Sequence, residues 1–488
     1  MMSQIEIKEK EINRALLLFV LPFSIKENRI VSLKKTLSEQ QFELFKLDDL
    51  SLEDKYYGDF QISHENIEGY YLPFTNKILF PSTENQEGFH RYSRPMNLDC
   101  KYRTEKFSLP FKLLSTDVTL CPINVGFITI RLQIDRGADF SAVMDFAARF
   151  RSLSPGRNSE SEISIQGKED TFKDVKEFIT KHINPSITDF FDKTNMEESY
   201  FETFPFFEDD KMYVQSIFSF RETDPFVKMD VFRAANLDGS DQEGKPNISS
   251  TNKRYINEFL KENSYDRWAP DTYYVVKEDH FSCITNEQRS GLDAIVSQMF
   301  GEYYYGTLLN LFHKIVLLKI ANDYSEIRVD RDREKVEELI YIVNSFTANY
   351  YFIELATQSQ GRDIFLHLRD VFKIEAMYDD GKQTLYSLYR YQESFSDKKN
   401  SLLLLYLTLF TVISGIYGMN QVIDDLKGNI NWERLMRYSL FEYIALFVTV
   451  SGMIVSVYLT ISTFLTWRKD RLKHKAWERK TAVSTRKQ

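Results

Sequence analysis

Two long uncharged runs near the C-terminal end constrain this chain more than any other feature. They cover residues 401–418 and 443–467, and neither contains a charged side chain. The apolar core of a bilayer is about 30 Å thick, and a helix needs ~20 apolar residues to cross it. Because only helices and closed barrels satisfy the backbone in lipid, both runs are predicted to be transmembrane helices. The first run is at the short end of this requirement.

The charges that flank these runs predict an orientation. Residues 468–488 are rich in Lys and Arg, and such a basic segment stays on the cytoplasmic side of a membrane. Two spans would then place both termini in the cytoplasm and residues 419–442 outside. The expected localisation is therefore the inner (plasma) membrane, as a multi-pass protein with the lipid bilayer as a partner.

Charge and cysteine content narrow the classes of function. The chain has 488 residues and a net charge of −9, although its last part is basic. An acidic segment before residue 401 disfavours direct binding of nucleic acid, whose phosphates it would repel. The cysteines Cys100, Cys121 and Cys283 are widely spaced, which predicts neither disulfide bonds nor a zinc site.

The long segment before the first run divides into two patterns. Up to about residue 295, short stretches rich in β-branched and aromatic residues alternate with helical periodicity, which predicts an α/β domain. Strands are predicted at Ala15–Phe23, Tyr70–Phe80, Val125–Ile134, Met212–Phe220 and Thr272–Val276, and helices at Phe140–Leu153 and Phe172–His182. Beyond residue 300 the periodicity is helical throughout, and the last of these helices is expected to continue into the first uncharged run, with Gly381 as a point for a bend.

These boundaries give a predicted order of six parts. They are a cytoplasmic α/β domain (1–295), a helical stalk (296–400), a first transmembrane helix (401–418), an external loop (419–442), a second transmembrane helix (443–467) and a basic cytoplasmic tail (468–488).

A short motif adds a family to this outline. Tyr417, Gly418, Met419 and Asn420 stand at the outer end of the first run. With two C-terminal spans and a basic tail, this Y-G-M-N sequence resembles the CorA family of magnesium and divalent cation transport proteins. The resemblance implies a funnel-shaped homopentamer in which five copies of the first span surround a pore, with Gly418, Met419 and Asn420 as the selectivity filter.

One face of the first run is suited to a pore. The polar and small residues recur every three or four positions, which places them on one side of a helix: Asn400, Leu404, Thr408, Thr411 and Gly415. Hydroxyl groups can hydrogen-bond a hydrated ion, and Leu404 is a candidate constriction. The alternative is that Thr and Gly serve helix packing, as they often do in lipid.

The expected cargo is Mg²⁺ or a related divalent cation, with no other cofactor. A ring of Asn420 side-chain carbonyls suits a hydrated Mg²⁺, since this ion gives up its water reluctantly. The loop after the motif differs from that of typical family members because it lacks their Met-Pro-Glu-Leu-like segment and is longer. This difference puts the rate of transport and the choice of ion in question.

The size of the N-terminal segment suggests an alternative function. Enlarged CorA-like proteins associated with type III CRISPR defence resemble membrane effectors opened by a nucleotide second messenger. Arg149, Arg151 and Arg157 are the candidate ligand-binding residues, and a surface helix end with a loop is the simpler reading of them. No nucleophile elbow, glycine-rich phosphate loop or paired-histidine motif is present, so an enzyme is not expected.

Overall fold

The computed structural model describes residues 7–153, 161–167, 170–192, 211–288, 290–327, 333–352 and 354–420, together with short pieces between 433 and 461. The chain divides into two compact units, residues 1–385 and 386–488. The first unit contains every strand and all but the last of the helices described below.

The described residues form eleven strands and twelve α-helices in chain order. The strands are β1 (Arg14–Ser24), β2 (Glu43–Leu44), β3 (His90–Thr104), β4 (Ser108–Cys121), β5 (Val125–Ile134), β6 (Ser161–Ile165), β7 (Thr171–Phe172), β8 (Tyr213–Ser219), β9 (Ser264–Tyr265), β10 (Thr272–Val276) and β11 (His280–Thr285). The helices are α1 (Ile30–Glu39), α2 (His64–Tyr70), α3 (Pro73–Leu79), α4 (Phe140–Phe150), α5 (Val175–Glu177), α6 (Lys228–Asn236), α7 (Lys253–Asn263), α8 (Ser290–Phe300), α9 (Glu302–Glu326), α10 (Arg333–Asn349), α11 (Ser359–Val371) and α12 (Ile374–Asn420). Single turns of other helix types lie at Leu50–Leu52, Phe178–Ile183 and Ile187–Phe190.

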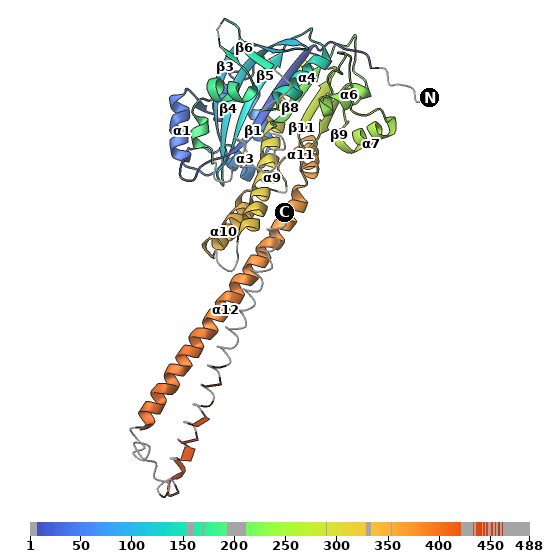
Figure 1. Ribbon diagram of the computed structural model, residues 1–488. Coiled ribbons are helices and arrows are strands. Elements are labelled where there is room, and N and C mark those ends of the chain that lie inside the picture. The colour runs from blue at the N-terminus through green and yellow to red at the C-terminus, as the bar shows by residue number, and fades with distance from the viewer. Residues whose placement is uncertain are drawn as a thin grey trace. The chain divides into compact units, whose positions relative to one another are not determined.

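All eleven strands join one mixed sheet (Figure 1). Their order is β7-β6-β3-β4-β5-β1-β8-β11-β10-β9, and β2 pairs with β3 outside this path. Neighbours are antiparallel except β8 and β11, which run parallel. A parallel pair needs a crossover connection, and here the chain between the two strands supplies α6, α7, β9 and β10.

The centre of the sheet is covered on both faces. Every residue of β5 is buried, and in β1 only Arg14 is partly exposed. On one face, α4 packs aromatic rings against the sheet, with Phe150 next to Phe19 and Phe140 next to Phe218. On the other face lie α8 and α9. Strands buried on both sides read as continuous apolar runs, which is why the sequence predicted β1 and β5 correctly.

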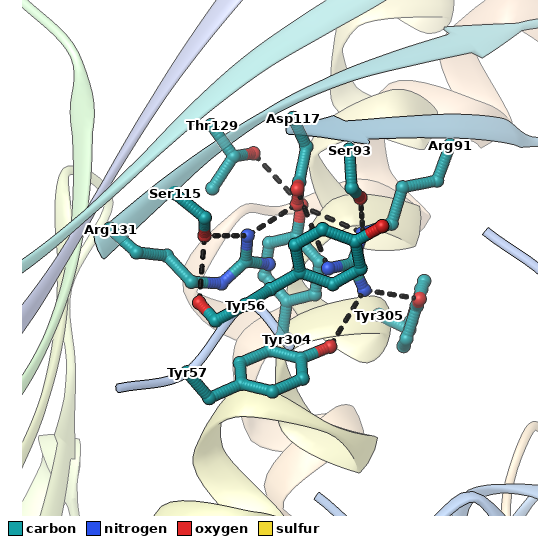
Figure 2. Close-up of polar contacts among 10 residues, drawn as sticks. All are labelled: Tyr56, Tyr57, Arg91, Ser93, Ser115, Asp117, Thr129, Arg131, Tyr304 and Tyr305. Carbon is teal, nitrogen blue, oxygen red and sulfur yellow. Dashed lines mark hydrogen bonds and ion pairs between the residues drawn. The ribbon is translucent and has the colours of Figure 1, made fainter. Parts of the chain in front are cut away.

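A buried charged cluster fastens α9 to its face of the sheet (Figure 2). We call Arg91, Asp117 and Arg131 the arginine cluster; all three side chains are at most 2% exposed. Asp117 Oδ2 lies 2.9 Å from Arg91 Nε and 2.5 Å from Arg131 Nη1. From α9, the Tyr305 hydroxyl accepts a 2.8 Å hydrogen bond from Arg91 and the Tyr304 hydroxyl contacts Asp117. The cluster therefore joins β3, β4 and β5 to the helix.

The helical pattern predicted beyond residue 300 is confirmed by α9, α10, α11 and α12. The expected long final helix is also present, since α12 has 47 residues. Its break from α11 falls at Phe372 and Lys373, where Lys373 adopts a positive φ of 56°. Gly381 instead lies inside α12.

The predicted funnel of an α/β domain, stalk helices and two C-terminal transmembrane helices is wrong. In the part of the chain that the structure describes, no helix is both long and apolar enough to cross a membrane. The run 401–418 is only the last part of a helix that carries Asp397, Lys398 and Lys399 just before it, and it is short of the ~20 residues a span needs. Of the run 443–467, only scattered residues are described. The multi-pass membrane localisation rested on these two spans and is corrected with them.

Two shorter predictions also need correction. The stretch Tyr70–Phe80 is not a strand but the end of α2 followed by α3. The stretch Phe172–His182 is not one helix, because it begins in β7 and passes through α5 into a π-helical turn.

Candidate functional site: a cationic pocket beside the start of α12

A pocket of about 760 Å³ lies where β8, the β10–β11 turn, α9 and the α11–α12 junction meet. This volume is in the range of small-molecule sites, ~300–1,000 Å³. Five basic side chains line it, each from a different segment of the chain: Arg151, Lys211, Lys277, Lys314 and Lys373. We call it the cationic pocket. Three carboxylates, Glu278, Asp279 and Asp370, also line it, so the formal charge is positive by two.

Two of the carboxylates already engage the basic side chains. Arg151 Nη1 donates a 2.8 Å hydrogen bond to Asp279 Oδ2, and Lys277 Nζ lies 3.9 Å from Asp279 Oδ1. Lys373 Nζ lies 3.7 Å from Glu278 Oε1. Burial alone would raise the pKa of Asp279, but Arg151 and Lys277 outweigh burial and hold this pKa below its usual value. Asp279 is therefore ionised at neutral pH.

Two buried donors of the pocket have no hydrogen-bond partner among the described residues. They are Arg151 Nε and the Tyr213 hydroxyl, on residues that are 8% and 2% exposed. Burial, together with the nearby Asp279, raises the pKa of Tyr213 well above its usual value, so its hydroxyl keeps its proton. A buried donor without a partner is costly, and most such groups in proteins are satisfied. A bound molecule that presents acceptor atoms would satisfy both.

The pocket also contains the junction between α11 and α12. Phe372 is buried, with its ring 5.7 Å from that of Tyr213 and with Lys314 Nζ 5.3 Å from its centre. Lys373 follows, and its left-handed backbone ends α11; its N–H donates to Asp370 O and its carbonyl accepts from Met377 N. The first turn of α12 is thus attached directly to a wall of the pocket.

A histidine lies next to the pocket on the buried side. His280, the first residue of β11, pairs its Nε2 with the Ser216 hydroxyl at 2.7 Å. Burial lowers the pKa of His280, so the ring is neutral. Both residues are at most 1% exposed, and the pair links β8 to β11 through their side chains.

A second hollow, of about 810 Å³, lies between α1 and α10 but has the opposite charge. Six carboxylates and three lysines line it, so it repels anions. Among the described residues, no three His, Cys, Asp or Glu side chains gather closely enough to hold a metal ion.

Of the three candidate ligand-binding arginines, one lines the cationic pocket. Arg151 lines the cationic pocket. Arg149 lies in α4, and its charge lowers the pKa of Tyr102 in β3 against the larger raising effect of burial. Arg157 is outside the described residues. The four lysines of the pocket could not be predicted from the sequence, because they are scattered between positions 211 and 373 with no motif around them.

The residues predicted to line a pore lie on α12. Asn400, Leu404, Thr408 and Thr411 are exposed. A Cβ atom added at Gly415 would have no other atom within 4 Å. Thr408 and Thr411 donate their hydroxyl hydrogens to the carbonyls of Leu404 and Leu407 in the same helix, at 2.7 and 2.8 Å.

The Y-G-M-N motif lies at the C-terminal end of the same helix, which continues through Asn420. The side chains of Met419 and Asn420 and the loop after them are outside the described residues, so the selectivity filter stays a prediction.

Comparison with protein-family models and with curated proteins found no match for this chain.

Proposed function

We propose that this chain is a ligand-gated effector in which the cationic pocket binds a phosphate-bearing nucleotide messenger and α12 carries the response. One observation supports it above the others. Five basic side chains from distant parts of the sequence meet at the junction where α12 begins. Arginine and lysine are the usual phosphate ligands in proteins, and the two unpartnered buried donors fit the oxygens of such a ligand.

The size and lining of the pocket favour a nucleotide over a simple ion. Alongside its charges the pocket is lined by Tyr213, Phe259, Leu311 and Ile315, which offer apolar and aromatic surface for a base or a sugar. The family resemblance implies passage of Mg²⁺ or a related cation and assembly as a homopentamer. Both stay predictions. So does the absence of enzymatic activity.

Lys373 connects ligand binding in the cationic pocket to α12. Its side chain reaches toward Glu278 in the pocket, and the next residue, Ile374, begins the helix. A ligand that attracts the Lys373 ammonium group would change the conformation of the junction. The left-handed backbone of Lys373 is an unfavourable state for a residue other than glycine, and the junction is therefore the point at which the conformation changes.

The test is calorimetric titration of the full chain with AMP, ATP and cyclic diadenylate. We expect saturable binding of at least one nucleotide, weakened about tenfold or more by Lys277→Gln and by Lys373→Gln, since hydrogen bonds to charged groups contribute ~1.5–3 kcal/mol. Lys35→Gln, which removes an exposed lysine from α1, is the matched control and leaves the affinity unchanged. Hydrogen exchange should show ligand-dependent protection at residues 370–378. Absence of binding by every probe, or equal affinities in all variants, would rule out this site.

A further inference from the structure

The two-residue turn between β10 and β11 places two carboxylates inside the cationic pocket. Lys277 N–H donates to His280 O at 2.7 Å, which closes the turn and leaves Glu278 and Asp279 at its tip. Their side chains engage different cations: Asp279 contacts Arg151 and Lys277, whereas Glu278 contacts Lys373. Three of the five basic side chains of the pocket are therefore held by two neighbouring acids.

The turn is anchored through its backbone and not through these acids. Asp279 O accepts a hydrogen bond from Val214 N at 3.2 Å, and β11 pairs with β8 directly after it. The Glu278 and Lys373 side chains are 59% and 74% exposed, and Asp279 is 46% exposed. The Glu278–Lys373 pair is exposed on both sides, and ion pairs this accessible are weak and exchange readily. In the other pair only the carboxylate is exposed, since the Arg151 side chain is 10% exposed. The two carboxylates can thus leave their cations by side-chain rotation while the strands stay in place.

We infer that the Glu278–Asp279 turn is an internal substitute for the ligand, and that the ligand carries at least two separate anionic groups. One group replaces the Asp279 carboxylate at Arg151 and Lys277, and the other replaces Glu278 at Lys373. This inference rests on the proposed function and adds the class of ligand, a diphosphate or a molecule with two phosphodiesters, and a mechanism of exchange.

The exchange explains the unpartnered donors. A carboxylate offers two oxygens, and here Asp279 leaves Arg151 Nε and the Tyr213 hydroxyl unsatisfied. A phosphate has more acceptor oxygens and more charge, and it can bind an arginine through two parallel hydrogen bonds. Replacement of Asp279 by phosphate therefore satisfies groups that the turn leaves without partners.

The exchange also separates Glu278 from Lys373, the residue directly before α12. In the ligand-free pocket this pair ties the α11–α12 junction to the β10–β11 turn. With ligand bound, Lys373 pairs with the ligand and no longer with the turn. The junction then responds to whether the pocket is occupied.

The test compares binding of inorganic phosphate, pyrophosphate and ATP to the full chain and to the double variant Glu278→Gln/Asp279→Asn. Removal of the competing carboxylates should tighten pyrophosphate binding about fivefold, since an accessible ion pair contributes up to ~1 kcal/mol. Pyrophosphate should bind the wild-type chain more tightly than phosphate does. Glu39→Gln removes an exposed, ion-paired carboxylate of α1 and should leave every affinity unchanged.

Each outcome has one meaning. Tighter binding of pyrophosphate by the double variant, with thermal unfolding unchanged, supports the inference. Binding to the wild-type chain that the double variant leaves unchanged or weakens overturns the inference but leaves the proposed site intact. Tight binding of ATP without pyrophosphate would show that the base and not the two anionic groups decides affinity, which also overturns the inference. No binding of any probe to either chain overturns the proposed function together with it.

Discussion

Substitution of Asp117 by asparagine tests whether the arginine cluster holds the sheet and α9 together by charge. Asp117 is the shared counter-charge of two arginines, and all three side chains are at most 2% exposed. Asp117→Asn keeps the size of the side chain but leaves two buried guanidinium groups without an anion. Breaking one buried ion pair costs ~3–5 kcal/mol, and here a single change breaks two. We expect a loss of about 5 kcal/mol, a large share of the ~5–15 kcal/mol that stabilises a typical domain.

The assay is urea unfolding of the full chain, followed by circular dichroism and by tyrosine and tryptophan fluorescence, so that the two units can be resolved if they unfold separately. Asp59→Asn is the matched control, because Asp59 is 70% exposed and lies 3.6 Å from Arg14; its loss should cost ~1 kcal/mol or less. Adding Arg131→Met to Asp117→Asn should recover part of the loss, since one of the stranded charges is then removed.

The pH dependence of the same variant gives an independent check. Burial would raise the pKa of Asp117, but Arg131 and Arg91 outweigh it and hold the pKa below its usual value. A lowered folded-state pKa gives stability that is present above the usual value of about 4 and is lost as the pH falls through the folded-state pKa. This acid-sensitive part should be missing from Asp117→Asn. A loss below about 1 kcal/mol, or no recovery with Arg131→Met, would refute the reasoning.

Three further substitutions test other parts of the first unit by thermal or urea unfolding. Burial raises the pKa of Glu302 to about 7, so between pH 4.5 and 7 the folded chain holds a proton that the unfolded chain has lost. The free energy of unfolding therefore falls by roughly 3 kcal/mol over this range as the pH rises. Glu302→Gln should remove this fall, and an unchanged pH profile would contradict the reasoning. Gln41, just after α1, has a left-handed φ of 64° while Phe42 N donates to Leu37 O, so Gln41→Gly should stabilise the chain by about 1 kcal/mol. Gly361→Ala should destabilise it by roughly 1–3 kcal/mol, because a methyl group there would collide with the Tyr70 hydroxyl; equal stability would show that Tyr70 can move.

The strands that the sequence predicted correctly are those in which burial leaves the strongest pattern. Val125–Ile134 and Thr272–Val276 match β5 and β10 residue for residue, because every position in them is buried and apolar or β-branched residues dominate. The stretch Tyr70–Phe80 has a similar composition but contains the last residue of α2 and the whole of α3. The signals for these helices were local: Pro73 stands at the first turn of α3, and the Ser63 hydroxyl caps α2 by accepting a hydrogen bond from the Asn66 N–H. In this segment the capping residues determine the secondary structure and the strand-like composition does not.

The site was less accessible to sequence analysis than the fold. Of the candidate ligand-binding arginines, Arg151 does line the cationic pocket. Its four lysine partners come from segments whose proximity depends on the parallel pairing of β8 with β11 and on the packing of α9. Nothing in their spacing indicates this pairing. The arginine cluster could not be predicted either, since the proximity of its three residues depends on the pairing of β3, β4 and β5.

The arginine cluster and the Glu278–Lys373 ion pair hold two walls of the cationic pocket with different strength. One wall is α9, which supplies Lys314 to the pocket and, three turns earlier, Tyr304 and Tyr305 to the arginine cluster. Any shift of α9 would disturb buried charges, so this wall is fixed. Another wall is the α11–α12 junction, where Phe372 is buried but Lys373 is exposed, has a left-handed backbone and pairs with Glu278. A ligand that acts on both walls will move the one that costs less free energy, and we therefore expect its binding to be transmitted to α12 and not to the sheet.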